Sequence, residues 1–158
     1  AGSPGFAFQP INSVLIETGT VTPFSIQRLG EHLVWLAQSA EGQGLIRRID
    51  GFKAERISTH AVETLLATAS TLTSAFAYSY EQEGHQYYVL TIPGSSPTTA
   101  LTLVYDLTAS TLAGVPMWHQ WLAFNGALFE RHWGNAFAFF NETSVLGDYR
   151  AYGKLFRM

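Results

Sequence analysis

The sequence predicts a mainly β protein built of antiparallel sheets, with one short helix near residues 60–70. Short apolar runs of strand length alternate with turns rich in Gly, Asp and Pro along the 158 residues. Charged residues make up only 13% of the chain and hydrophobic residues 47%, a balance that suits sheets, turns and extensive subunit contacts. A single interval places its apolar residues at helical spacing.

The clearest strand pair is a hairpin predicted over 32–49. Two apolar strands flank a turn at 40–44 whose composition is rich in Gly. Asp50-Gly51 follows at once and is typical of another tight turn. Two earlier strands are expected at 7–11 and 13–17.

The helix is predicted over about 60–70. Ser58 or Thr59 is placed to cap its free N–H groups, and Glu63 lies near the first turn, where the helix dipole favours an acid. The apolar residues that form one face are Val62, Leu65, Leu66, Ala69 and Leu72.

Strand signals resume after the helix and continue to the end of the chain. A turn at 81–84 separates the first two of these strands, and 106–110 is predicted as a turn in which Asp106 bonds the backbone ahead of it. The predicted strands are 75–80, 85–92, 100–105, one at 118–121, 127–132, 135–140, 145–149 and 154–157.

A weak internal repeat indicates propeller-like blades. Residues 34–51, 88–109 and 144–158 each hold an apolar strand, a turn and a second apolar strand, often with an Asp. Their spacing of about 40–60 residues is that of propeller blades. Three partial units cannot close a ring, and the chain opens without Met. We therefore expect 1–158 to be a single fragment, a partial propeller from a larger protein, with open sheet edges that recruit partners.

Composition excludes several classes of function. The net charge is −3 and Lys and Arg do not cluster, so electrostatic binding of nucleic acid is not expected. The chain has no Cys, which excludes disulfides, thiolate nucleophiles and Cys-based zinc sites. No apolar run approaches the ~20 residues of a membrane span, so no membrane association is expected.

Neither a metal nor another cofactor is expected, because the histidines are scattered. His119 and His132 with Glu130 come nearest to a metal-ligand set, but nothing in the pattern places them on one face. Satisfied or exposed histidines are the simpler interpretation.

An enzyme is not expected either. A catalytic His85 would need a nucleophile, and Ser79 and Ser95 lack the Gly-x-Ser-x-Gly context. Glu81 and Glu83 lie on a hairpin tip, where charge usually serves solvation. A glycoside hydrolase that uses acids such as Glu81 and Glu130 is nevertheless a rival hypothesis. We instead expect His85 to bond across to a neighbouring turn and lock it.

The aromatic residues leave a second alternative open. They lie within strand patterns, which favours core or subunit packing. Exposed together, they would form a sugar-stacking platform, so a carbohydrate-binding propeller or lectin-like module is the alternative function. The residues concerned are Trp35, Trp118, Trp121, Trp133, Phe137, Phe139 and Phe140.

Blocks in order along most of the chain carry a family resemblance. The chain resembles the packaged-DNA stabilisation proteins of short-tailed bacteriophages, also described as tail accessory or tail-hub proteins. It departs from their pattern where Leu112–Pro116 intervene before Trp-His, and where Gln120-Trp121 stand in place of an acid and Arg. The matching blocks are FAFQPINSVLIETG, SIQRLGEHLVWLAQSAEGQGLIRRIDGFKAERISTHAVE, AFAYSYEQEGHQYYVLTIP, LVYDLTASTLAGVPMWHQW and VLGDYRAYGKLFRM.

The resemblance implies a structural virion protein of the head-to-tail connector, located in the tail or neck and in the host cytoplasm during assembly. It implies a protein that helps to close the portal channel, to retain packaged DNA and to attach needle or fibres. The implied partners are portal and adaptor proteins, tail needle or fibre proteins and copies of itself in a homo-oligomeric ring, with DNA passing without sequence-specific binding. The expected structural motif residues are Trp35, Gly84, His85, Tyr105, Asp106, Trp118, Gly147 and Asp148.

Overall fold

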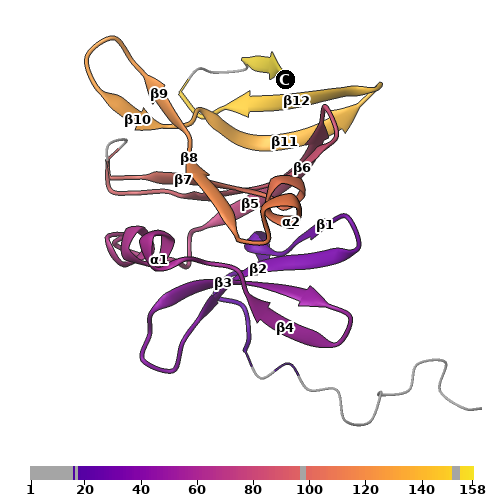
Figure 1. Cartoon of the computed structure of the whole chain (residues 1–158). Helices are drawn as coiled ribbons and strands as arrows, with labels where there is room; N and C mark the ends of the chain where they lie inside the picture. The colour runs from indigo at the N-terminus through magenta and orange to yellow at the C-terminus, as the bar shows by residue number, and fades with distance from the viewer. Residues whose placement is uncertain (1–15, 17, 97–98, 151–153) are drawn as a thin grey trace, which may run out of the picture.

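The computed structural model describes residues 16, 18–96, 99–150 and 154–158, and these form the mainly β, antiparallel fold that the sequence predicts (Figure 1). The first sheet has the order β1-β2-β3-β4 and the second the order β5-β6-β7-β8. A two-stranded sheet, β10-β9, and a third sheet, β11-β12-β13, follow. The sheets of the described residues do not close into a ring (Figure 1). The predicted strands at 7–11 and 13–17 lie outside these residues, apart from Ile16.

The element bounds agree with most of the predicted strands. A 3-10 turn, η1 (Pro23–Ser25), precedes the first sheet, and two helices, α1 and α2, occur within the described residues. The bounds are β1 Gln27–Leu29, β2 His32–Gln38, β3 Gly44–Asp50, β4 Lys53–Arg56, α1 His60–Ala67, β5 Phe76–Gln82, β6 His85–Ile92, β7 Leu101–Asp106, α2 Leu107–Ala113, β8 Met117–Gln120, β9 Leu122–Phe124, β10 Phe129–Arg131, β11 Gly134–Phe140, β12 Thr143–Asp148 and β13 Leu155–Arg157.

The hairpin predicted over 32–49 is confirmed as β2–β3, with Leu36 opposite Ile46. Successive side chains of β2 point to opposite faces, as in any strand. Leu36 lies in the core that the first and second sheets share, whereas Trp35 lies in a smaller cluster with Ala37 and Leu45. The strand is therefore apolar on both faces, which is why it reads as a continuous apolar run rather than an alternating one.

The main core lies between the first and second sheets. Leu36, Ile46, Tyr88 and Leu90 are all 0% exposed and belong to one apolar cluster. The Tyr88 hydroxyl donates to the Ser25 carbonyl at 2.8 Å, so this buried phenol keeps a hydrogen-bond partner. Burial in this core raises the Tyr88 pKa.

A second core covers the opposite face of the second sheet. Tyr78 and Val89 pack there against Phe137 and Leu146 of the third sheet, and the Tyr78 and Phe137 rings stack with centroids 5.1 Å apart. The second sheet is thus buried on both faces, between the first sheet below and the third sheet above in Figure 1. This layered arrangement is the stacking expected of propeller blades.

Helix α1 is shorter than predicted, because it ends at Ala67 rather than near residue 70. Thr59 caps its N-terminus by accepting from the Val62 N–H at 3.4 Å. At the other end the Thr68 hydroxyl donates to the Leu65 carbonyl at 2.7 Å. This local bond competes with a further helical turn, as Thr side chains commonly do. Leu72 still packs against the core from beyond the helix.

The predicted turn at 106–110 is wrong, and with it the prediction of one helix only. Asp106 does bond the backbone ahead, since its Oδ1 accepts from the Ala109 N–H at 2.8 Å. That bond is the N-cap of α2, which continues to Ala113 and stops at Gly114, whose φ is +69°. The bond of an Asx turn and that of a helix cap are the same at this point, so only the following residues distinguish them.

The strand expected at 118–121 is divided. β8 ends at Gln120 and β9 begins at Leu122. The Trp121 N–H donates to the Thr102 carbonyl at 2.9 Å, which carries the chain from the second sheet into the β9–β10 hairpin.

Candidate functional site

The corner at Gly84-His85 is a two-residue hairpin turn. Gln82 pairs with His85 across it, and Glu83 and Gly84 between them have φ of +51° and +81°. Positive φ at both central positions is the geometry whose twist matches paired strands. Gly84 adopts it without steric cost, whereas Glu83 holds it as a non-glycine residue.

His85 reaches from this turn to the start of α2. Its Nδ1 lies 2.6 Å from Asp106 Oδ2, and the His85 side chain is 40% exposed while that of Asp106 is 8% exposed. The other oxygen of Asp106 caps α2 through the Ala109 N–H. One carboxylate thus joins the tip of the β5–β6 hairpin to the N-terminus of a helix.

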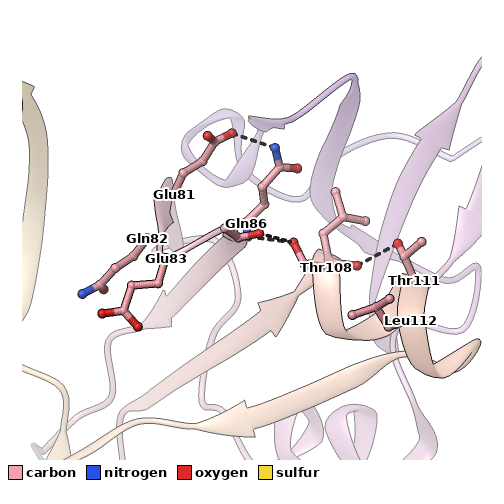
Figure 2. A pocket seen from close by; sticks show the side chains of 9 residues that line it. Glu81, Gln82, Glu83, Gln86, Thr108, Thr111 and Leu112 are labelled. Carbon is pink, nitrogen blue, oxygen red and sulfur yellow. Dashed lines mark hydrogen bonds between the residues drawn. The ribbon is translucent and has the colours of Figure 1, made fainter.

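Thr108 adds a second connection at the same corner. Its hydroxyl donates to the Gly84 carbonyl at 3.1 Å and accepts from the Gln86 N–H at 3.2 Å (Figure 2). The His85 ring also stacks on Tyr87, with centroids 5.8 Å apart. The turn is therefore held to the first turn of α2 by two side chains, those of the N-cap Asp106 and of Thr108.

Tyr105 and Trp118 extend the connection to Ile57, the residue that follows β4 of the first sheet. Their rings lie 5.0 Å apart, and Trp118 Nε1 donates to the Ile57 carbonyl at 2.8 Å. Gly84, His85, Tyr105, Asp106 and Trp118 are thus brought together around α2. This group is referred to below as the α2 corner.

Trp35 lies elsewhere, on the face of the first sheet that points away from the second sheet, and is 5% exposed.

Gly147 and Asp148 lie on β12, in the third sheet. The Asp148 side chain is 1% exposed, and its Oδ2 accepts from Arg150 Nη2 at 3.0 Å. The hydrogen bonds from Arg150 hold the pKa of Asp148 below its ordinary value. A Cβ at Gly147 would lie in ordinary contact with the Ala136 Cβ, 3.6 Å away.

An open groove of about 530 Å³ lies between the β5–β6 tip and α2 (Figure 2). Glu81 accepts a hydrogen bond from Gln86 Nε2 at 2.7 Å. Glu81 and Glu83 are both exposed, and Figure 2 shows their side chains directed differently rather than toward a common point. The groove offers carboxylates and hydroxyls but no convergent acid–base pair among its lining residues.

Residues 1–156 match the family model described as Bacteriophage P22 Gp10, beta-propeller, a phage-stabilisation family. The chain belongs to this family. The resemblance read from the sequence blocks is thereby confirmed, and the first and second sheets are interpreted as propeller blades. No curated protein sequence matches the chain significantly.

Membership of the phage-stabilisation family makes the chain a phage structural protein, and such proteins are generally not enzymes. Two of the side chains considered for catalysis, His85 and Ser79, have structural partners. His85 contacts Asp106, and the Ser79 hydroxyl donates to the Arg28 carbonyl at 2.7 Å. No helix within the described residues has the length and apolar character needed to cross a membrane.

His119, His132 and Glu130, the residues nearest to a metal-ligand set, are not assembled into one. Across the described ranges, no group of three or more His, Asp or Glu side chains is arranged to hold a metal ion. Glu130 accepts from Trp133 Nε1 at 3.2 Å and from Arg150 Nη1 at 3.4 Å. Burial, followed by the charges of Arg131 and Arg150, lowers the His132 pKa.

The polar network around Arg150 in this phage-stabilisation family member was not predicted from the sequence. Arg150 bridges Asp148 and Glu130, and its guanidinium lies 3.5 Å from the centre of the Trp133 ring. Arg131 lies 3.8 Å from the Tyr149 ring centre in the same way. The two acids bound by Arg150, Glu130 of β10 and Asp148 of β12, belong to different strands, and no local sequence pattern joins them to Arg150.

Proposed function

We propose that this member of the phage-stabilisation family belongs to the head-to-tail connector or tail hub. There it helps to close the portal channel, retains packaged DNA and provides attachment for needle or fibres. The observation that carries the proposal is the match of residues 1–156 to the family model.

The physical role is mechanical. The second sheet is buried on both faces by apolar cores, and side-chain bonds tie its hairpin tip to α2. Such a cross-linked stack resists shear without any catalytic group. The net charge of −3 favours a protein surface that repels DNA phosphates rather than one that binds them, so that DNA can pass without sequence-specific binding.

Exposed apolar residues support contacts with partners. On the β9–β10 hairpin, Leu122 is 48% exposed, Phe124 55% and Phe129 64%. Large apolar side chains at the surface favour burial against another protein. We propose portal or adaptor proteins, needle or fibre proteins and further copies in a ring as those partners, met first in the host cytoplasm and then retained in the virion.

The test uses the phage that encodes the chain, with its gene interrupted by an amber codon. Particles made in a non-suppressing host should package DNA and then lose it, so the genome becomes sensitive to added nuclease. Wild-type protein supplied in trans should restore protection. Normal, nuclease-resistant, infectious particles without the protein would contradict the proposal.

A matched variant separates this role from glycoside hydrolysis. Glu81→Gln with Glu83→Gln removes both tip carboxylates while keeping their size. Because neither carboxylate is needed for a mechanical closure, particles carrying this double substitution should retain DNA as the wild type does. Loss of a glycan-cleaving activity in those particles would support the hydrolase hypothesis, and loss of DNA retention would contradict the mechanical role.

A further inference from the structure

A crevice of about 380 Å³ lies where the second sheet meets the third sheet. Tyr80 and Gln82 of β5 line one side, and His132, Trp133 and Phe156 line the other, with Trp121 from the connection between β8 and β9. This volume falls in the range of small-molecule pockets, about 300–1,000 Å³. The crevice shares no residue with the α2 corner, although Gln82 also lines the open groove beside α2. The proposed mechanical role does not require the crevice.

The aromatic walls of the crevice are held in place by their neighbours. Trp133 is fixed twice, because its Nε1 donates to Glu130 at 3.2 Å and Arg150 covers one ring face at 3.5 Å. The Trp121 ring lies 5.0 Å from the His132 ring and 6.2 Å from that of Tyr80. Rings fixed before a ligand arrives lose little conformational freedom on binding, which favours affinity.

The polar groups at the crevice suit hydroxyls rather than a phosphate. Gln82 is exposed and carries a carboxamide that both donates and accepts. The Gly134 N–H donates to His132 Nδ1 at 3.2 Å, which leaves the proton of the neutral imidazole on Nε2. Burial, and then the charges of Arg131 and Arg150, lower the His132 pKa, which favours the neutral ring. Arg157 is the single cation among the lining residues.

We propose that this crevice binds a neutral saccharide. The C–H face of a pyranose ring is apolar and packs against aromatic rings, while its hydroxyls require donors and acceptors at the edge. The crevice supplies both kinds of contact. The indole rings of Trp121 and Trp133 give the apolar surface, and the Gln82 carboxamide and the His132 imidazole give the donors and acceptors. A nucleotide fits less well, because its phosphate would rely on one exposed arginine rather than on a cluster of donors.

The test is a titration of the full chain with neutral hexoses, deoxyhexoses, N-acetylhexosamines and their disaccharides, followed by tryptophan fluorescence. At least one sugar should give saturable binding. Trp121→Ala should weaken that binding by at least about tenfold, the scale of losing one stacked ring. Gln82→Ala should also weaken it, and Gln86→Ala, on the same hairpin but outside the crevice, should bind as the wild type does.

Three outcomes would overturn the proposal. The first is the absence of saturable binding by every sugar of the panel. The second is binding that Gln82→Ala and Trp121→Ala leave unchanged, and Gln82→Ala alone decides this if Trp121→Ala fails to fold by circular dichroism. The third is tighter binding of deoxyguanosine monophosphate than of any saccharide, which would assign the crevice to nucleotides.

Discussion

Asp106 is expected to be the most sensitive polar position of the α2 corner. It is 5% exposed and uses both carboxylate oxygens, one for the Ala109 N–H at 2.8 Å and one for His85 Nδ1 at 2.6 Å. Asp106→Ala removes both bonds. Asp106→Asn retains an acceptor for the helix cap but loses the charge, so the two substitutions separate the contributions.

The magnitude follows from the two bonds. Loss of a helix N-cap costs about 1 kcal/mol. Loss of a hydrogen bond to a charged group costs about 1.5–3 kcal/mol, and the lower end applies here because the His85 side chain is 40% exposed and can bond to water instead. Asp106→Ala should therefore lower the free energy of unfolding by about 2–3 kcal/mol, and Asp106→Asn by about 1 kcal/mol. For a chain of this size the first loss corresponds to a fall in Tm of about 5–10 °C.

Urea unfolding of Asp106→Ala, His85→Ala and the double variant measures the coupling between the two side chains. A coupling energy of about 1 kcal/mol is expected for residues in direct contact. His119→Ala is the matched control, since it removes an exposed histidine of β8 and should change stability by less than about 0.5 kcal/mol. Full additivity of the His85 and Asp106 effects would refute the reasoning.

Three further predictions concern other parts of the molecule. Glu63 is 1% exposed and accepts from Arg56 and Ser58; Glu63→Gln should cost about 1–2 kcal/mol in urea unfolding, because its buried hydrogen bonds lose a charged acceptor while Arg56, whose side chain is 53% exposed, can bond to water. A cost below about 0.5 kcal/mol would contradict this. Leu90→Ala should cost about 2–5 kcal/mol by the same assay, since Leu90 is 0% exposed in the main core; a smaller loss would mean that the site collapses. Asp148→Asn should destabilise the protein by about 1–3 kcal/mol at pH 7. The pKa of Asp148 in the folded protein lies below its ordinary value of 3.8. The stabilisation by its carboxylate is therefore fully present above pH 3.8 and is lost as the pH falls through the folded pKa. A pH-independent difference between Asp148→Asn and the wild type would contradict the assigned ion pair.

The sheet elements were largely predictable, because each pairs two segments close in sequence. The hairpin of β2 and β3 and the one at Gly84-His85 follow from apolar runs that flank a turn. Turn chemistry and strand length are local properties, so they can be predicted from a single amino-acid sequence.

Helix α2 was not predicted, because the residues that distinguish a helix from a turn follow Asp106 in the sequence. Asp106 gives the same local bond in a turn and at a helix cap. What extends the helix is the burial of Leu107 and Ser110 and the Gly114 termination at φ +69°. Burial is a tertiary property, and it overrides weak local propensity over seven residues.

The candidate site was predictable only in part. The sequence pointed to His85 and to a neighbouring turn as its partner, but not to Asp106, which lies 21 residues further along the chain. The Arg150 network and the crevice at Trp121 and Trp133 depend on how the third sheet packs on the second. Such contacts join segments that have no common local pattern, so they required the structure.

A cryo-electron microscopy reconstruction of the purified virion tests the central claim most directly. Antiparallel sheets stacked face to face, with α2 resting on the tip of the β5–β6 hairpin, should fit density at the junction of head and tail. Purified particles that lack the chain, or density there that is mainly helical, would contradict the assignment.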